Sequence, residues 1–278
     1  SSDSITAIGS DGFTVGADSN GYVSSGTDKQ VSWCWKAGGS ASSNSDGSIT
    51  SSVSANTTAG FSIVSYTGNG TAGATVGHGL GSAPTWVLIK NRTGSSKSWQ
   101  IGHQGIGFQN GVYLNLQDAS SSDNGAFNST APSSSVFTLG TSSFTNTSSD
   151  NYISYCFAEK KGYSKFFSYE GNSNSDGTFV YLGFRPAWLM VKPVDASDNY
   201  VMFDNKRHNA KNSTTAPYFL YANKNFAETT DTKLIDLLSN GFKIRSSGNT
   251  VNRSSTFIGM AFSESPFVNS SGVANNGR

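Results

Sequence analysis

The sequence is poor in charge, in cysteine and in long apolar stretches. Charged residues make up only 13 % of the 278 residues, and the formal net charge is +1. Nucleic acids and anionic membranes attract clustered Lys and Arg, which are scattered here, so neither partner is predicted. No apolar run approaches the length of a membrane span, and the N-terminus lacks the basic and then apolar pattern of a secretion signal.

The two cysteines, Cys34 and Cys156, stand at the same place in a recurring block whose third copy has Ala261 there. Equivalent positions in successive domains lie farther apart than a disulfide allows. We therefore expect two unpaired thiols, in a chain compatible with folding in a reducing cytosol.

Residues typical of catalysis or metal binding are scarce. The three histidines have no metal-spaced neighbours, and the HExxH, CxxC and Gly-x-Ser-x-Gly motifs do not occur. Glycoside cleavage needs two facing carboxylates, yet the candidates have no counterparts in the other copy of the repeat. The sequence thus predicts no cofactor, no metal and no enzymatic activity. The carboxylates considered are Asp195, Asp198, Asp204, Glu228, Asp231 and Asp236.

What the sequence does contain is a strand-like block that occurs three times, twice within a longer unit. Tyr66 recurs 103 positions later as Tyr169, and Pro84 recurs after 102 positions as Pro186. A fixed period of domain size indicates a structural unit copied in tandem. The block pairs residues 12–15 with 31–35, then 136–139 with 153–159, and finally 241–244 with 257–264.

Short alternating segments separated by Asn-Gly and Asp-Gly turns predict strands nearly everywhere. Their number and regular spacing predict an all-β fold of tandem β-sandwich domains, of the jelly-roll or concanavalin-like kind. Trp86 and Trp188 recur within apolar strands, so we expect both in the core. The one helix-like stretch is 231–238, and Ser-Asn-Ser-Asp-Gly at 43–47 and 173–177 predicts turns.

The repeat divides the chain into five parts. We expect the first to be completed by chain from outside this sequence, since two paired strands alone are marginally stable. The starting point within a repeat, without an initiator Met, suggests a longer product. The parts are 1–39, the C-terminal half of a first repeat; 40–59, a Ser/Thr-rich linker or loop; 60–163 and 164–267, β-sandwich repeats; and 268–278, a C-terminal tail.

Candidate ligand residues lie in the least repetitive stretch of the last copy. Variable loops on a fixed scaffold are where binding specificity usually resides. Arg207, His208, Tyr218 and Tyr221 are therefore the predicted ligand-binding residues.

The blocks resemble a recurrent element of tail-fibre and other virion proteins of marine phages, including cyanophages. The resemblance lies in Gly12–Gly16 with Val31–Gly39, in Tyr152–Phe166, and in Gly183–Lys192 with Glu264–Val268. It spans almost the whole chain outside 40–58. It implies a virion tail protein, folded in the host cytoplasm before assembly with other virion subunits. A homo-oligomer, a trimer by analogy with fibres, and a host-surface glycan or receptor are the partners that it suggests.

Composition and resemblance together favour a non-enzymatic phage virion protein, a tail fibre or distal tail component that displays loops for host attachment. A purely structural capsid-decoration or tail accessory protein is one alternative. A glycan-degrading tailspike is another, and a cellular surface adhesin is a more distant one.

Overall fold

The computed structural model describes residues 4–9, 11–17, 23, 29–94, 96–122, 124–207, 218–230 and 234–263. It divides into two compact units, Ser1–Trp35 and Lys36–Arg278. Strands and turns dominate the described residues, and the two α-helices among them, α1 (Asn124–Phe127) and α2 (Asn249–Asn252), have four residues each. The expected all-β fold is confirmed.

Within the described residues of the first unit, β1 (Ile5–Ile8) and β2 (Phe13–Val15) form an antiparallel hairpin. Residues 31–35, expected to form a strand, are not in one, and both Val31 and Cys34 are exposed. That expectation was wrong because an alternating pattern makes a strand only beside partners. The corresponding strands of the second unit each pair on both sides.

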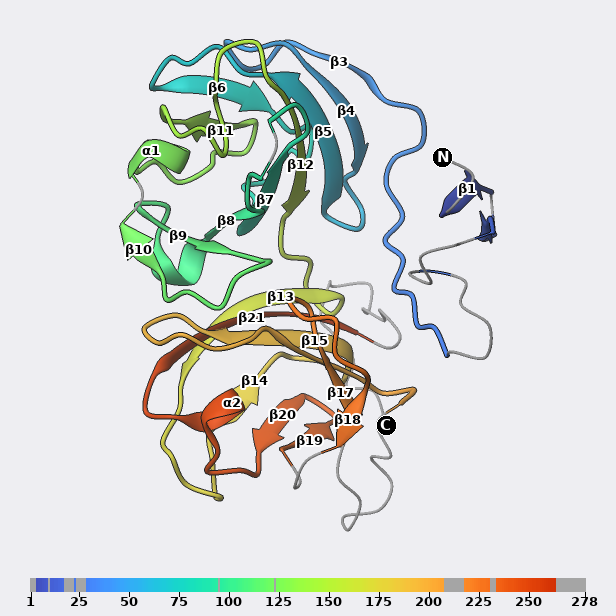
Figure 1. Cartoon of the computed structure of the whole chain (residues 1–278), viewed down its shortest axis with the longest axis vertical. Helices are drawn as coiled ribbons and strands as arrows, with labels where there is room; N and C mark the ends of the chain where they lie inside the picture. The colour runs from blue at the N-terminus through green and yellow to red at the C-terminus, as the bar shows by residue number, and fades with distance from the viewer. Residues whose placement is uncertain are drawn as a thin grey trace. The chain divides into compact units, whose positions relative to one another are not determined.

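The second unit has two halves, each with a large and a small antiparallel sheet (Figure 1). In the first half the large sheet has the order β10-β9-β8-β7-β12-β5-β4-β3, and the small one pairs β11 with β6. The strands are β3 (Ser42–Asn44), β4 (Ser51–Asn56), β5 (Phe61–Thr67), β6 (Ala74–Gly77), β7 (Trp86–Asn91), β8 (Gln100–His103), β9 (Asn110–Tyr113), β10 (Ser121–Ser122), β11 (Val136–Leu139) and β12 (Asn151–Phe157).

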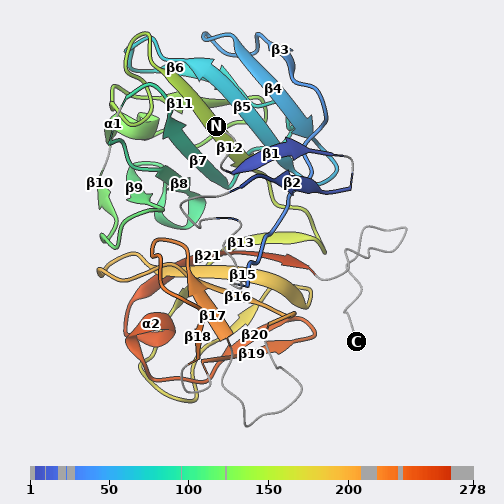
Figure 2. The ribbon, with the colours of Figure 1, turned by 45° about the vertical axis from the view of Figure 1, so that its right-hand side comes forward.

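The second half repeats this order as β18-β17-β16-β15-β21-β13, with a small sheet β14-β20-β19. β21 lies between β13 and β15, just as β12 lies between β5 and β7 (Figure 2). The strands are β13 (Ser164–Glu170), β14 (Phe179–Tyr181), β15 (Pro186–Pro193), β16 (Val201–Asp204), β17 (Tyr218–Tyr221), β18 (Thr229–Thr230), β19 (Ile235–Leu238), β20 (Gly241–Ile244) and β21 (Thr256–Ser263).

The core of each half lies between its two sheets. In the first half, Val64 and Val87 of the large sheet share a buried cluster with Val76 and Phe137 of the small one. Phe167 and Phe242 are members of the matching cluster in the second half. Each half is therefore a two-layered, sandwich-like β structure.

A buried asparagine holds the turns at the same corner of each half. Asn146 accepts the backbone N–H of Asn69 at 2.9 Å and donates to the carbonyls of Thr71 and Gly140. Asn252 accepts the N–H of Asn172 at 3.0 Å and donates to the carbonyls of residues 174 and 246. Both side chains are fully buried, and one amide thus satisfies three backbone groups from two separate segments.

The outer face of the second half's large sheet packs against the first half. Phe166 of β13 contacts Trp86, with ring centroids 6.4 Å apart. Lys192 of β15 donates to the carbonyl of Gln117 at 3.0 Å. Trp86 and Trp188 are both buried, as predicted, and Trp86 contributes to this junction between the two halves.

Residues 40–59 were expected to form a linker or loop, and this expectation was wrong. They contain β3 and β4, which extend the large sheet beyond β5. Val53 is buried, and the hydroxyls of Ser51 and Ser54 donate to the carbonyls of Gly77 and Gly39. Short hydroxyl side chains bond the neighbouring backbone here, so the strand needs few apolar residues.

The helix-like stretch 231–238 is also corrected. Residues 231–233 lie outside the described residues, and Ile235–Leu238 form β19, paired with β20. Ile235 and Leu237 point to the core while Leu238 is exposed, which is the alternation of a strand. The predicted turn at 173–177 is present as a series of bends.

Candidate functional site

The predicted ligand residue Arg207 bridges two carboxylates near the end of β16. Its Nε lies 2.6 Å from Asp204 Oδ2, and its Nη1 lies 2.6 Å from Glu228 Oε2. The backbone N–H groups of Lys206 and Arg207 also donate to Asp204 Oδ1. Asp204 is therefore a buried residue that fixes the turn after β16, whereas 39 % of the Glu228 side chain remains exposed.

Tyr218 lies beside this ion network. It pairs with Thr230, two residues after Glu228, so Tyr218 and Glu228 are diagonal neighbours across β17 and the start of β18. Continuing the β16–β17 register by two residues also places Tyr218 opposite Asp204. Tyr218 as a whole is 41 % exposed. An exposed aromatic ring and an exposed carboxylate held by a guanidinium thus adjoin at one end of the sheet.

Tyr221 and His208 do not join this cluster. Tyr221 packs against the core of the second half and contacts Phe219 and Phe226 edge to face. It stands three residues from Tyr218 on the same strand, so the two side chains point to opposite faces. His208 lies outside the described residues.

The remaining carboxylate candidates are also engaged within the fold. Asp198 pairs with Arg253 at 2.9 Å, and Asp236 pairs with Arg245 at 2.6 Å. Asp195 accepts the backbone N–H of Thr256 at 2.9 Å. Asp231 lies outside the described residues.

The two described histidines are buried and bonded to the backbone. His78 Nδ1 accepts the N–H of Leu80 at 3.2 Å, and its Nε2 lies 3.2 Å from the Ser133 carbonyl oxygen. His103 Nδ1 accepts the N–H of Gly105 at 2.9 Å. Burial lowers the pKa of His78, and it lowers the pKa of His103 to about 4. Both rings are thus neutral structural groups near pH 7.

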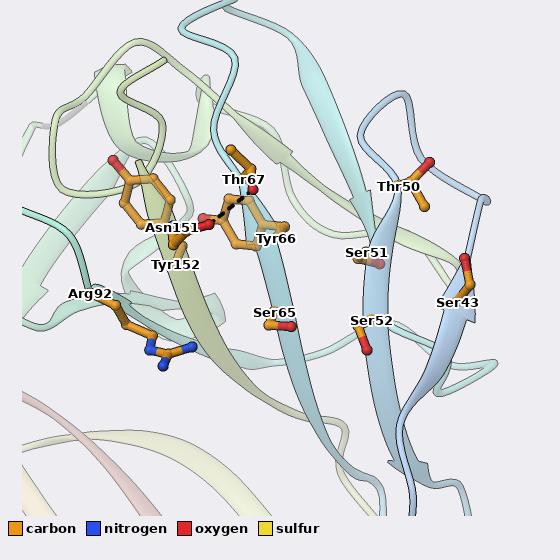
Figure 3. Close-up of a pocket in the computed structure, with 10 residues that line it drawn as sticks. All are labelled: Ser43, Thr50, Ser51, Ser52, Ser65, Tyr66, Thr67, Arg92, Asn151 and Tyr152. Carbon is orange, nitrogen blue, oxygen red and sulfur yellow. Dashed lines mark hydrogen bonds between the residues drawn. The ribbon is translucent and has the colours of Figure 1, made fainter. Parts of the chain in front are cut away.

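A second polar surface crosses β3, β4, β5 and β12 (Figure 3). It is a groove of about 380 Å³ lined mainly by hydroxyl groups, with Arg92 and Asn151 at one end. Thr67 Oγ1 donates to Asn151 Oδ1 at 3.0 Å. Several of its hydroxyls belong to residues 40–59, which were expected to form a linker or loop, so this groove was not predicted from the sequence. The lining residues are Ser43, Thr50, Ser51, Ser52, Ser65, Tyr66, Thr67, Arg92, Asn151 and Tyr152.

A family model described as a domain of unknown function (DUF7483) matches residues 1–266. The chain belongs to this family. No curated protein and no solved structure matches the chain. The DUF7483 match includes the N-terminal hairpin as well as both halves of the second unit, so the family's domain is defined across both units.

The described part of this DUF7483 chain holds no group of three or more His, Cys, Asp or Glu side chains able to bind a metal ion. Within the same residues, no helix has the length and apolar character needed to cross a bilayer. Cys34 and Cys156 are both free thiols. Burial raises the pKa of the Cys156 thiol to about 12, which keeps it protonated and unreactive.

Proposed function

We propose that this chain is a non-enzymatic phage virion protein, part of a tail fibre or another distal tail component, that binds glycans on the host surface. Its repeated blocks resemble those of marine phage virion proteins, and its low charge suits surface display. By the same resemblance, the chain folds in the host cytoplasm and assembles with other virion subunits as a trimer. The number and regular spacing of its strands favour tandem jelly-roll or concanavalin-like domains.

The adjoining exposed groups Tyr218 and Glu228 carry the glycan-binding part of the proposal. An aromatic ring stacks on the apolar face of a sugar, and a carboxylate accepts hydrogen bonds from its hydroxyls. Arg207 fixes Glu228 before the ligand arrives, which lowers the entropy cost of binding. The same guanidinium bonds both Asp204 and Glu228, whereas a glycosidase requires one carboxylic acid to donate a proton. This arrangement supports binding over hydrolysis.

The test is a glycan-array and whole-cell binding assay on the full chain, with its oligomeric state measured by light scattering. We expect saturable binding that weakens about tenfold or more in Tyr218→Ala and in Glu228→Gln. Tyr181→Ala, which alters an exposed tyrosine on β14, is the matched control and is expected to bind normally.

Two results would reject the proposal. A correctly folded oligomer that binds neither glycans nor cells points to a purely structural capsid-decoration or tail accessory protein. Sugar release that is abolished by Asp204→Asn points to a glycan-degrading tailspike.

A further inference from the structure

An open groove runs along the outer edge of β13 in the second half of the larger unit. It has a volume of about 690 Å³ and is lined by residues 165–170 of β13, residues 178–181 of the β14 region, Gln104 and Glu159. Among the strands of the described residues, β13 pairs with β21 alone. We refer to this feature as the β13–β14 groove.

The same position in the first half is filled by residues 47–56. There β4 pairs with the outer edge of β5, and Ile49 bridges to Val76 of β6. β5 corresponds to β13, since each pairs with the central strand of its sheet. β6 corresponds to β14, because Val76 lies opposite Phe137 and Val180 lies opposite Phe242. The first half thus shows that an extended segment can occupy the position that is open in the second half.

The backbone of β13 presents hydrogen-bonding groups to the groove. Phe166 donates its N–H to the carboxylate of Glu159 at 3.4 Å, so this N–H points away from β21. Since N–H and C=O directions alternate along a strand, both groups of Ser168 point the same way. Ser168 corresponds to Ser65, which pairs with Ser52 of β4. An added strand would therefore find the same pattern of donors and acceptors as β4 finds on β5.

The side chains around the groove differ from those of the first half. Phe179 and Tyr181 stand at the positions of Thr75 and Gly77, with 42 % and 62 % of their surfaces exposed. A Cβ atom on Gly77 would lie 1.6 Å from Asn44 Oδ1. Tyr181 therefore excludes a segment that follows the path of residues 42–44, whereas the edge of β13 itself lines the groove.

Each charged side chain that lines the groove has a partner within the fold, an ion pair for Lys165 and Glu159 and a hydrogen bond for Glu170. Lys165 Nζ lies 3.5 Å from Glu159 Oε1, and Glu170 accepts a hydrogen bond from the Thr256 hydroxyl at 2.8 Å. A partner therefore does not need a charge of its own, in keeping with the uncharged side chains of β4.

We propose that the β13–β14 groove binds an extended, uncharged, Ser-rich polypeptide segment with the chemistry of residues 51–56. The segment adds to the outer edge of β13 as an antiparallel strand, as β4 adds to β5. Exposed strand edges are general templates for such pairing. Glu159 competes with the incoming strand, because its carboxylate accepts a hydrogen bond from the Phe166 N–H that the strand needs.

The test is a titration of the full chain with a fluorescent synthetic peptide of the sequence of residues 50–57. We expect saturable binding that tightens several-fold in Glu159→Ala and weakens about tenfold when the peptide residue equivalent to Ser54, whose N–H in β4 faces the neighbouring strand β5, is N-methylated. Tightening in Glu159→Ala separates strand addition from ordinary contact, because loss of a contacting side chain would weaken binding. Tyr218→Ala is the matched control and is expected to leave the affinity unchanged.

Ser168→Pro removes one of the backbone donors of β13 and is expected to weaken binding about tenfold. The N-methylated peptide repeats this test without altering the protein, so a folding defect in the proline variant does not obscure the result. The proposal is overturned if neither the wild type nor Glu159→Ala binds the peptide, or if N-methylation has no effect. Glycan binding that Tyr181→Ala abolishes would assign the groove to sugars instead.

Discussion

Lys90 in the first half of the larger unit and Lys192 in the second stand at equivalent positions, but they differ in how far they are buried. Lys90 near the end of β7 lies over the ring of Trp99, and Lys192 near the end of β15 lies over the ring of Tyr200, each with Nζ 5.6 Å from the ring centroid. Lys90 is partly exposed, whereas Lys192 is fully buried and donates to the carbonyls of Pro193 and Gln117.

This difference follows from what covers each sheet. The first half packs on the outer face of the second half's sheet, and residues 47–56 cover only the first half's strand edges. The large sheet of the second half is thus covered on its outer face, whereas the outer edge of its strand β13 is open. In the first half the equivalent edge, that of β5, is closed by β4. Two copies of one fold therefore acquire different surfaces, because different segments of the chain pack against them.

The largest expected effect is on stability, and it comes from the buried asparagine that the two halves share, Asn146 in the first and Asn252 in the second. Asn252→Ala and Asn146→Ala each leave buried backbone groups without partners, so each is expected to lower the free energy of unfolding by roughly 3–5 kcal/mol. Denaturant unfolding of the two variants measures the loss. Asn174→Ala, which changes an exposed turn residue, is expected to cost about 1 kcal/mol or less. A small effect in either buried position would show that the two corners are not equivalent.

A smaller effect distinguishes the two halves, namely the change in the free energy of unfolding with pH that Lys192 of the second half causes. Burial lowers the pKa of Lys192 from 10.5 to about 8, with opposing contributions from the nearby Asp198 and Asp118. Between these values the unfolded chain holds the proton and the folded chain does not. The free energy of unfolding therefore rises with pH across this window, by no more than about 3 kcal/mol.

Urea unfolding at a series of pH values measures that slope. Lys192→Met is expected to remove this part of the pH dependence, while Lys90→Met, the matched change in the first half, is expected to retain it. Equal slopes in the wild type and Lys192→Met would contradict the assignment.

The smallest effect concerns the strands that only the first half has. Ser51→Ala and Ser54→Ala each remove a hydroxyl bonded to a backbone carbonyl, and each is expected to cost about 1 kcal/mol. Ser52→Ala, on the exposed side of β4, is expected to change stability by about 0.5 kcal/mol or less. Thermal unfolding distinguishes these outcomes, and three equal small effects would mean that residues 40–59 contribute little to the fold.

Much of the fold could be predicted from residue patterns, because alternation and turn residues act locally. The strands around Trp86 and Trp188 and the equivalence of Tyr66 with Tyr169 follow from sequence alone. β4 escaped prediction because its polar side chains bond the backbone instead of forming an apolar stripe. β19 resembled a helix because its leucines and isoleucine fit both periods over so short a run.

The candidate site was partly predictable. Arg207 and Tyr218 were chosen as ligand candidates because they lie in the stretch that departs most from the repeat. Their partner Glu228 was considered only as a catalytic carboxylate, since sequence spacing does not reveal that Arg207 joins it to Asp204. Tyr221 was chosen as a ligand candidate too, but its side chain packs against the core. The face of the sheet to which a strand residue points depends on the strand's register, which the sequence pattern did not reveal. The hydroxyl groove was missed together with β3 and β4.

By itself, the sequence determined the all-β class, the repeated order of strands and the buried aromatic residues, since these depend on local patterning and on apolar burial. Tertiary structure alone decided which strand edges are closed, which of two matching lysines is buried and which tyrosine faces outward. These features depend on contacts between segments far apart in the chain, and each segment's own pattern is compatible with either outcome.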